Sequence, residues 1–342
     1  MSDNTVSVII PNYNGLNYLK NCLSSIEKNI DLNIILIIVD NGSDSETVDF
    51  LKNINQKSVN IENKSINKIF TINYNILFNK NNLGFAKAVN QGIILSKQLD
   101  IDFTILLNND VEIESNYFSN LLHIIKSEDK IFSVSSKMLR WDNKNIIDDA
   151  GDDYTLLGWT LKNGDGKSKE KFSKDCECFS ACGGAAIYRL STFDEIGLFD
   201  EKFFLYLEDV DIGYRAKIVG YKNLYTSKAI VYHRVSGTTG SKYNKFKTKI
   251  SARNNIYLIY KNMPWIQIII NIGFIVIGFL IKYLFFYKKG FGKLYSQGII
   301  EAIKDIRIGK IKKIEFNFKH LKNYILIEYL LIKNTFKLVF SY

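Results

Sequence analysis

The sequence has no glycine-rich phosphate-binding loop. Neither Gly-x-Gly-x-x-Gly nor Gly-x4-Gly-Lys-Ser/Thr follows the first predicted strand, Val6–Pro11. This absence disfavours a dinucleotide-dependent dehydrogenase and a P-loop nucleotidase, because both hold phosphate groups with the backbone of such a loop. Any phosphates that the protein binds are therefore expected to be neutralised by a metal ion.

Cysteine and histidine are also scarce. The four cysteines, Cys22, Cys176, Cys178 and Cys182, do not have a usual zinc spacing, and no histidine lies near the last three. We therefore expect reduced, mostly packed thiols. The segment Met1–Thr5 carries no basic or apolar run, so no secretory signal peptide is expected and the chain is interpreted as cytoplasmic.

Charge is unevenly distributed along the chain. The net charge is +10, but the part from Tyr243 to the C-terminus has 18 Lys and Arg against four Asp and Glu. That part therefore carries +14, which leaves −4 for the preceding residues. A basic and apolar tail suggests an anionic partner, for which a membrane surface and a nucleic acid are the usual candidates.

The N-terminal part alternates short apolar runs with helix-like periodicity. Strands are predicted at Val6–Pro11, Ile34–Val39, Asn75–Phe78 and Phe103–Leu107, with helices between them. The segment from Asn53 to Tyr74 has no clear period and is interpreted as an inserted loop. This order of elements predicts an α/β fold with a mostly parallel central sheet.

Polar residues follow three of these strands. The loops are Asn12–Gly15, Asp40–Asp44 and Asn108–Asp110. In open α/β sheets, ligands bind beyond the carboxyl ends of the strands, so we expect the three loops to converge on one ligand. Asp110 would then face the ligand, whereas the alternative is that the Asn108–Asp110 segment simply forms a turn.

A second polar group follows the aromatic run Phe203–Leu207. Three carboxylates, Glu208, Asp209 and Asp211, occupy four positions there. Crowded carboxylates beside apolar side chains raise one another's pKa, which suits a general base near neutral pH. The alternative is that they only favour a helix N-terminus. His233 ends another short apolar strand and is a candidate metal ligand.

Together these motifs resemble those of the family 2 glycosyltransferases, and specifically their bacterial rhamnosyltransferase-like branch. The resemblance extends from Val6 to about Arg307 and is carried by VSVIIPNYNG, IIVDNGSD, NLGFAKAVNQG, LLNNDV, FLYLEDVDIGYR and His233, in the family's order. It implies the GT-A fold, a nucleotide-sugar-binding α/β fold, and chemistry that inverts the anomeric centre.

The resemblance implies a set of donor-binding residues. They are Pro11, Tyr13, Asp40, Asn82, Gly84, Lys87, Asn108 and Asn109. The first three would line the nucleoside pocket, with Asp40 accepting a hydrogen bond from the base or ribose. The segment around Gly84 would close over the ribose and diphosphate.

The resemblance also implies a metal ion and a base. Asn108–Asp110 stands where the family has Asp-x-Asp, so Asp110 would be the main acidic ligand of Mg²⁺ or Mn²⁺ and His233 would complete the metal or diphosphate site. The amide at Asn108, a departure shared with the rhamnosyltransferase-like branch, leaves open how tightly metal binds without donor. Asp209 would be the catalytic base that accepts a proton from the acceptor hydroxyl.

In the tail, one helix is expected to begin at Ser251. A second, apolar segment, Pro264–Tyr287, is long enough to cross a bilayer. Its polar residues Gln267, Asn271 and Lys282 fall on one narrow helical stripe, and lysines follow it. The segment is therefore interpreted as a helix in the interface of an anionic membrane. The alternative is a spanning helix whose stripe faces protein.

We divide the chain into a GT-A glycosyltransferase domain, residues 1–250, and a helical, basic, membrane-associating region, residues 251–342. The domain comprises a donor half, residues 1–112, and an acceptor half, residues 113–250.

The predicted function is an inverting, metal-dependent glycosyltransferase of cell-surface glycan synthesis. It would move a sugar, with rhamnose as the branch's suggestion, from a dTDP- or UDP-sugar to a lipid-linked or polysaccharide acceptor at the cytoplasmic face of the cell membrane. The partners would include an anionic membrane surface but no nucleic acid, since the tail is too apolar for one. The alternative is a non-catalytic sugar-nucleotide-binding or scaffold protein on the same fold, with Asn108 as a mark of lost activity.

Overall fold

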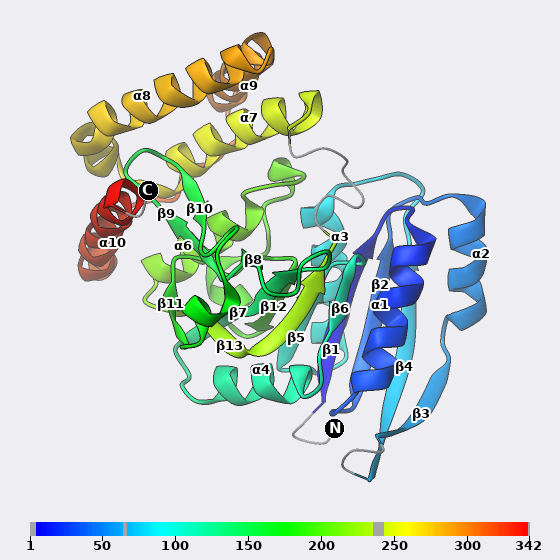
Figure 1. The fold of residues 1–342 in the computed structure, drawn as a ribbon. Helices are drawn as coiled ribbons and strands as arrows, with labels where there is room; N and C mark the ends of the chain where they lie inside the picture. Colours follow the sequence, from blue (N-terminus) through cyan, green and yellow to red (C-terminus); the bar gives the residue numbers. More distant parts are fainter. Residues whose placement is uncertain (1–4, 64–66, 235–242, 341–342) are drawn as a thin grey trace.

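The computed structural model describes residues 5–63, 67–234 and 243–340 (Figure 1). Its central sheet has the strand order β11-β13-β7-β12-β5-β1-β2-β4-β3, with β6 and β8 paired to its sides. Its strands are β1 (Val6–Asn12), β2 (Ile34–Asp40), β3 (Ser58–Asn63), β4 (Lys68–Phe78), β5 (Phe103–Leu107), β6 (Val111–Ile113), β7 (Ile131–Arg140), β8 (Ile147–Asp149), β11 (Cys176–Cys178), β12 (Ala185–Arg189) and β13 (Lys222–His233).

In the N-terminal half of the sheet, strands β5, β1, β2 and β4 pair in parallel, as predicted. Strand β1 pairs in parallel with β2 and β5, and β2 pairs in parallel with β4. The inner strands β1, β2 and β5 are buried almost throughout, as expected for apolar runs covered on both faces. The helices of this half, also predicted between the strands, are α1 (Leu16–Asn29), α2 (Ser45–Ile54) and α3 (Phe85–Gln98).

The prediction of a loop over Asn53 to Tyr74 was wrong. Strand β3 and the first part of β4 lie there and pair as an antiparallel hairpin at the edge of the sheet. The signal was an alternation of larger side chains, with Ile72, Tyr74 and Ile76 buried and polar residues between them. Asparagines on the open face obscured this two-residue period.

The following half is mixed. Strand β12 lies antiparallel between β5 and β7, and β13 pairs in parallel with β7, so β7 and β13 run in the same direction as β5. Its helices are α4 (Tyr117–Lys126), α5 (Thr192–Ile196) and α6 (Glu208–Ile218), with short 3-10 turns at Lys169–Phe172 and Glu201–Phe203. A small hairpin, β9 (Asp152–Tyr154) and β10 (Thr160–Lys162), stands apart from the main sheet.

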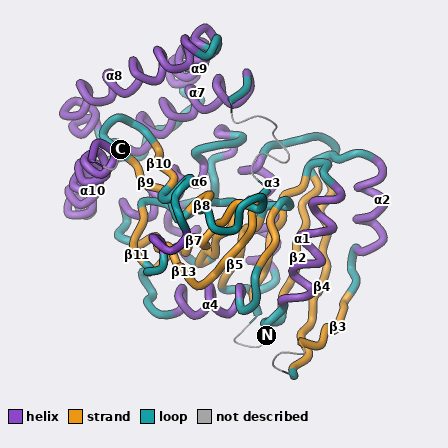
Figure 2. The backbone as a smooth tube through the Cα atoms, viewed as in Figure 1, coloured by secondary structure: helices purple, strands orange, loops and turns teal. Residues whose placement is uncertain are grey.

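Four helices form a layer beside this half of the sheet (Figures 1 and 2). They are α7 (Lys245–Asn262), α8 (Trp265–Lys288), α9 (Gly292–Arg307) and α10 (Leu321–Phe340), with a 3-10 turn at Phe318–His320 before α10. A shared core joins this layer to the rest, because Tyr154, Phe179 and Tyr214 pack in one cluster with Tyr257 and Leu331. The tail is therefore packed on the acceptor half.

Two details of the tail differ from the prediction. Helix α7 begins at Lys245 rather than Ser251, because the side chain of Asn244 caps it by accepting from the backbone N–H of Lys247. The polar stripe of α8 faces protein, as the alternative interpretation supposed, since Gln267 and Asn271 are buried. The pattern predicted correctly which residues share a face but not what that face contacts.

Candidate active site

The three polar loops at the carboxyl ends of β1, β2 and β5 meet, as predicted. The side-chain amide of Asn109 donates to Asn12 Oδ1 at 2.7 Å, and that of Asn12 donates to Asp40 Oδ1 at 3.2 Å. Parallel pairing places Asn12 directly beside Asp40 in the sheet. A chain of hydrogen bonds therefore fixes these loops relative to one another.

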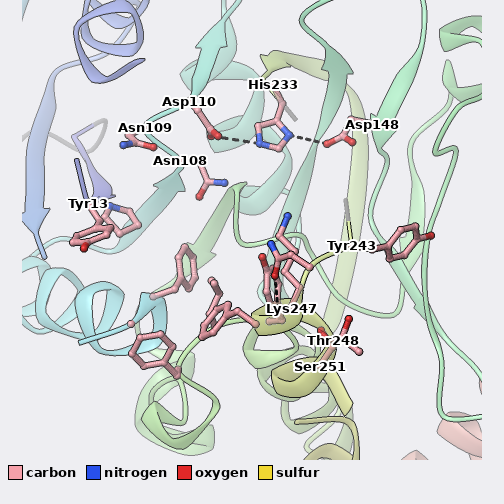
Figure 3. A pocket seen from close by; sticks show the side chains of 18 of the residues that line it. Tyr13, Asn108, Asn109, Asp110, Asp148, His233, Tyr243, Lys247, Thr248 and Ser251 are labelled. Atoms are coloured by element: carbon pink, nitrogen blue, oxygen red, sulfur yellow. Dashed lines mark hydrogen bonds and ion pairs between the residues drawn. The ribbon is translucent and has the colours of Figure 1, made fainter. Parts of the chain in front are cut away.

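A cavity of about 1200 Å³ lies beyond these strand ends (Figure 3). The loops after β1, β2, β4 and β5 contribute to one part of its wall, and the first turns of α7 contribute to another. It is lined by Pro11, Asn12, Tyr13, Asn41, Asn82, Gly84, Phe85, Asn108, Asn109, Asp110, Arg140, Asp142, Asp148, Lys162, Asp165, Phe204, Leu205, Tyr206, His233, Tyr243, Asn244, Lys245, Phe246, Lys247, Thr248, Ser251 and Phe286.

The two predicted metal ligands lie next to each other at the wall of this cavity. His233 Nε2 lies 3.4 Å from Asp110 Oδ1, and His233 Nδ1 lies 2.8 Å from Asp148 Oδ2 (Figure 3). Asp110 Oδ1 is buried. It accepts no hydrogen bond of good geometry, although His233 Nε2 lies 3.4 Å away. A buried carboxylate oxygen beside an imidazole nitrogen is a donor set that suits a divalent cation such as Mn²⁺.

The charges around His233 are strongly coupled. Burial by itself would lower the pKa of His233, but the nearby carboxylates of Asp110 and Asp148 raise it to about 9. Burial would raise the pKa of Asp148, yet His233 and Lys162 lower it to about 2. A cation bound at Asp110 and His233 would take the place of the imidazolium proton, because a metal ligand must be neutral imidazole.

Asp148 was not predicted, and its contact with Nδ1 orients the histidine. We expect Asp148→Asn to weaken Mn²⁺ binding about 10- to 100-fold, because a carboxylate behind a histidine ligand fixes its tautomer and ring orientation. Calorimetric titration of Mn²⁺ in the presence of a nucleoside diphosphate measures this. Asp165→Asn is the matched control, since Asp165 lines the same cavity but pairs with Arg140. Equal affinities of the two variants would show that Asp148 has no positioning role.

Six of the eight predicted donor-binding residues line the cavity. They are Pro11, Tyr13, Asn82, Gly84, Asn108 and Asn109. Asp40 and Lys87 do not. Asp40 is fully buried and accepts hydrogen bonds from Asn12 and from the backbone N–H of Ser43, so it holds the loops beneath the cavity. Lys87 pairs with Glu201, with Nζ 2.9 Å from Oε2.

Gly84 is required by a close approach of the backbone. Its φ is +85°, and a Cβ at this position would lie 2.5 Å from the carbonyl oxygen of Phe204. The Phe204–Leu207 turn is itself unusual, because Phe204, Tyr206 and Leu207 all have positive φ. Such non-glycine residues are strained. The side-chain amide of Asn254 in α7 stabilises the turn by donating to the carbonyl oxygens of residues 203, 205 and 206 at 2.8–2.9 Å.

This turn leads directly into the Glu-Asp pair at the start of α6. Glu208 is buried, whereas Asp209 is partly exposed and accepts from the backbone N–H of Gly183 at 3.2 Å. Asp209 does not itself line the cavity, but Gly183 lies between it and the cavity residue Phe85. Burial raises the pKa of Asp209 against the lowering effect of its backbone hydrogen bonds. Of the two, Asp209 is the more accessible carboxylate.

A second acidic cluster lies close to Asp209. Within the described part of the chain, ligand atoms of Asp149, Asp152 and Cys182 lie within 4.8 Å of one another. Burial raises the pKa of Asp149 to about 6 and that of Asp152 well above its usual value, with Asp209 adding to both shifts. Lys162 opposes this, with Nζ 3.7 Å from Asp149 Oδ2.

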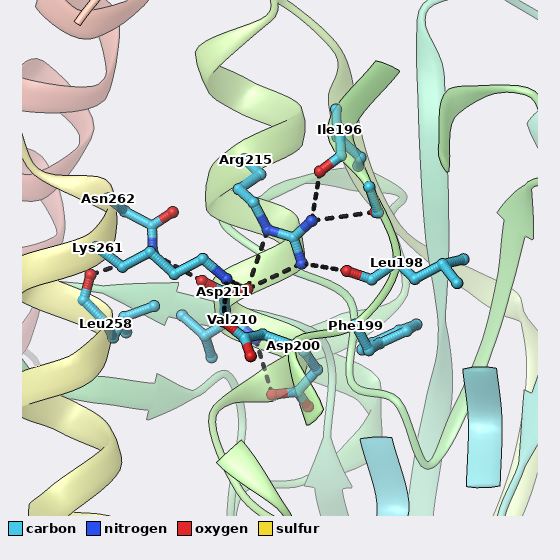
Figure 4. Close-up of polar contacts among 12 residues, drawn as sticks. Ile196, Leu198, Phe199, Asp200, Val210, Asp211, Arg215, Leu258, Lys261 and Asn262 are labelled. Carbon is cyan, nitrogen blue, oxygen red and sulfur yellow. Dashed lines mark hydrogen bonds and ion pairs between the residues drawn. The ribbon is translucent and has the colours of Figure 1, made fainter. Parts of the chain in front are cut away.

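Asp211 does not belong to the predicted crowded group. Its carboxylate is fully buried and is held by Arg215, Lys261 and Asn262 at 2.8–3.0 Å (Figure 4). Burial would raise its pKa, but Arg215 and Lys261 lower it below the usual value. The interpretation of three carboxylates acting together was wrong for this one, which instead ties α6 to α7.

We expect Asp211→Ala to lower the free energy of unfolding by about 3–5 kcal/mol, because it leaves two buried cations without their shared partner. Urea denaturation followed by circular dichroism measures the loss. Asp194→Ala is the control: Asp194 pairs with Lys97 at the surface with its side chain 69% exposed, so its removal should cost no more than about 1 kcal/mol. Similar losses in both variants would contradict this role for Asp211.

Sequence reasoning missed the charged wall formed by Arg140, Asp142, Asp148, Lys162 and Asp165. These residues come from the ends of β7, β8 and β10 and the loops beside them. The run IDDAGDD at residues 147–153 was their one local signal. The aromatic wall around Phe204 and Tyr206 was noticed in the sequence only as a run that precedes the carboxylates.

Comparison with known proteins agrees with this geometry. The arrangement of strands and the site at their carboxyl ends define a GT-A-like α/β protein, as predicted. The family model described as glycosyl transferase family 2 matches residues 7–197. That match covers more than half of the chain, so the chain belongs to glycosyl transferase family 2.

The curated relatives are rhamnosyltransferases, which confirms the predicted resemblance to that branch. The chain is 26% identical over 266 residues to the O-antigen chain rhamnosyltransferase RfbN of Salmonella typhimurium, covering 77% of this chain and 74% of RfbN. It is 40% identical over 58 residues to the N-acetylglucosaminyl-diphospho-decaprenol L-rhamnosyltransferase of Mycobacterium tuberculosis, covering 17% of this chain and 19% of that enzyme.

Solved structures show the same fold at low sequence identity. GalNAc-T7 with UDP, GalNAc and Mn²⁺ has a TM-score of 0.54 and 17% identity, and the match covers 76% of this chain but only 48% of GalNAc-T7. The mannosyltransferase PcManGT from Pyrobaculum calidifontis, in complex with GDP-Man and Mn²⁺, has a TM-score of 0.52 and 11% identity, covering 95% of this chain and 84% of PcManGT.

Proposed function

We propose that this glycosyltransferase moves rhamnose from a nucleoside diphosphate donor to a lipid-linked or polysaccharide acceptor with inversion at the anomeric carbon. The observation that carries the proposal is the facing pair of Asp110 and His233, in a cavity whose wall also includes the donor-loop residues Tyr13 and Asn82. Rhamnose is supported by the rhamnosyltransferase relatives, one of which acts on a diphospho-decaprenol acceptor by name.

The chain's own residues account for donor binding. Pro11 and Tyr13 offer a half-exposed apolar surface for a base, and Asn108 and Asn109 supply uncharged donors and acceptors beside it. Asp110 and His233 would hold Mg²⁺ or Mn²⁺. When bound, the ion would neutralise the diphosphate and make it a better leaving group. Manganese in the GT-A-like relatives GalNAc-T7 and PcManGT supports this assignment.

Asp209 is proposed as the base. An acceptor hydroxyl is a poor nucleophile until a carboxylate accepts its proton, and Asp209 keeps part of its surface exposed while the neighbouring Glu208 is buried. The hydroxyl oxygen then forms a bond to the anomeric carbon from the face opposite the departing diphosphate. A single displacement of this kind inverts the anomeric centre and needs no second carboxylate as nucleophile.

We place the enzyme at the cytoplasmic face of the cell membrane, acting in cell-surface glycan synthesis. Helix α8 supports attachment, because it has 24 residues, a mean hydropathy of 2.3 in its most apolar window and little buried surface. The basic charge of the C-terminal part favours an anionic leaflet.

A donor screen tests the proposal. Purified full-length protein is incubated with dTDP-rhamnose, UDP-hexoses and GDP-sugars, and Mn²⁺-dependent release of nucleoside diphosphate is measured with and without a prenyl-diphosphate-linked sugar. We expect turnover with dTDP-rhamnose that increases when the acceptor is present. Tight nucleotide binding without any turnover would instead favour a non-catalytic sugar-nucleotide-binding protein.

A further inference from the structure

Helices α8 and α10 turn their apolar faces outward. Among the described residues, α8 carries 13 exposed large hydrophobic side chains and α10 carries eight, against nine in all of the chain before α8. On α10, Ile325, Tyr329, Ile332 and Phe336 recur at helical spacing and are 38–62% exposed. Soluble surfaces rarely expose contiguous apolar patches of this kind without a binding partner.

The inner faces of both helices pack on one hairpin. The indole N–H of Trp159 donates to the carbonyl oxygen of Gly278 in α8 at 3.1 Å, and the backbone N–H of Leu156 donates to Thr335 Oγ1 in α10 at 2.9 Å. The β9–β10 connection therefore lies beneath both helices, and their exposed faces point away from it. A Cβ at Gly278 would lie 2.2 Å from the carbonyl oxygen of Leu157, so the contact is close.

A carboxylate links the two helices directly. Glu328 of α10 accepts hydrogen bonds from the side-chain amides of Gln267 and Asn271 of α8, at 2.7 and 2.9–3.0 Å. If α8 crossed a bilayer in this arrangement, Glu328 and the hairpin would be carried toward the hydrocarbon core, which is costly for charged and unpaired polar groups. The polar stripe that suggested an interface is thus a protein contact, and it opposes a span.

Exposed basic residues occur between the two apolar helices in the sequence. From the last residue of α8 to the first turn of α10, the exposed lysines include Lys288, Lys289, Lys293, Lys310, Lys312, Lys319 and Lys322. Exposed apolar helices linked by a lysine-rich segment are complementary to acyl chains beneath anionic head groups. A partner protein would need an apolar surface as large as the exposed faces of α8 and α10, with acidic residues opposite the lysines. An anionic lipid leaflet supplies both the apolar surface and the negative charge.

We infer that α8 and α10 form one membrane-binding face, which lies in the plane of an anionic leaflet. The cavity opens at the edge of this face. Phe286 of α8 lines the cavity, and Tyr243, which also lines it, contacts the rings of Phe285 and Phe286 with centroids 5.4 and 6.2 Å apart. Phe246 continues this apolar path at the cavity wall and is 51% exposed.

This path gives a bilayer-anchored acceptor a route to the site. Its lipid would stay in the leaflet beside the C-terminal end of α8, while its sugar enters the cavity past Tyr243 and Phe246. This second part of the inference rests on the proposed function, whereas the membrane-binding face does not.

Vesicle binding tests the face. Flotation of the full-length protein with vesicles of phosphatidylglycerol and phosphatidylcholine is compared for wild type and for a variant with Ile325, Tyr329, Ile332 and Phe336 all changed to Ser. We expect the vesicle partition coefficient to fall about tenfold or more, because the variant loses four apolar side chains that would be buried among the acyl chains. The control changes Val59 and Ile69 to Ser, on the opposite edge of the sheet, and should bind as wild type does. Unchanged binding of the α10 variant, or equal binding to pure phosphatidylcholine, would overturn the inference.

Depth measurements distinguish an in-plane helix from a span. Ile270, Ile277 and Leu284 share one exposed face of α8, and each is changed singly to Cys in a Cys176→Ser background and labelled with a fluorophore. An in-plane helix gives three equal, shallow depths in lipid-quenching experiments. A spanning helix gives a deep label at residue 277 and labels about 10 Å shallower on either side, given a rise of about 1.5 Å per residue.

An activity arm separates this inference from the proposed function. Wild type and the α10 variant are compared on the same sugar diphosphate carried by a long prenyl chain in vesicles and by a short, soluble prenyl chain. We expect the variant to lose transfer only to the vesicle-borne acceptor. Equal loss on both acceptors would overturn delivery from the leaflet, and absence of transfer by wild type would instead count against the proposed function.

Discussion

Replacing Asp110 with alanine should abolish metal-dependent donor binding. Asp110 supplies a buried oxygen that lies 3.4 Å from His233 Nε2 and accepts no well-formed hydrogen bond. Its loss would remove the proposed main acidic ligand of the ion. The diphosphate would then have to bind without its counter-charge. Calorimetric titration of dTDP-rhamnose with Mn²⁺ should show a fall in affinity of at least about 100-fold, consistent with the loss of an essential metal ligand.

The control for this variant is Asp142→Ala. Asp142 also lines the cavity, and its loss changes the local charge equally without touching the pair of Asp110 and His233. The same titration without Mn²⁺ should show no difference between Asp110→Ala and wild type. Full metal-dependent affinity in the Asp110→Ala protein would place the ion elsewhere, for which the cluster of Asp149, Asp152 and Cys182 would be the next candidate.

Asp209→Asn should lower the transfer rate by roughly two to four orders of magnitude while leaving donor affinity nearly unchanged, as expected for the loss of a general base. The amide keeps the size of the side chain and one oxygen that can accept from the backbone N–H of Gly183, but it cannot accept the acceptor's proton. Steady-state kinetics with saturating donor and acceptor measure the loss in kcat.

The pH dependence of the same reaction provides an independent test. The base must be ionised, so the rate should fall as pH falls through the pKa of Asp209. Burial raises that pKa, so the fall should occur at higher pH than for an ordinary aspartate. Glu208→Gln is the matched variant at the neighbouring position. If it were inactive and Asp209→Asn remained active, the base would be Glu208.

The convergence of the loops could be predicted from the sequence because it follows from local patterns and one general rule. Apolar runs mark the buried strands, and parallel pairing brings their carboxyl ends to one edge of the sheet. Asn12, Asp40 and Asn109 accordingly lie in one hydrogen-bonded chain. The fold class was predictable for the same reason.

Side-chain partners that are distant in sequence could not be predicted. Asp148 orients His233 because β8 pairs with β7, which in turn pairs with β13, and nothing near Asp148 in the sequence records this. Lys87 occupies the expected segment, but its ammonium group pairs with Glu201. In each case a motif fixes the position of the backbone, while a remote residue decides what the side chain contacts.

What the polar face of α8 contacts could not be predicted from the sequence either. The spacing of Gln267 and Asn271 correctly predicted a shared face on α8. Whether that face meets water, lipid or protein depends on Glu328, which comes about sixty residues later. A pattern within one helix contains no information about this partner.

The hydrogen bonds between Asn254 and the Phe204–Leu207 turn show that the C-terminal helices support the glycosyltransferase domain. The strained backbone that presents Asp209 is held by an amide from α7, a helix that lies mostly beyond the predicted domain boundary at residue 250. Arg253 supports the same segment by donating to the carbonyl oxygens of Lys202 and Phe203. A fragment ending at residue 250 would thus lack the side chains that hold the turn before Asp209. The C-terminal helices would therefore support the turn before Asp209 through α7, in addition to carrying the inferred membrane-binding face on α8 and α10.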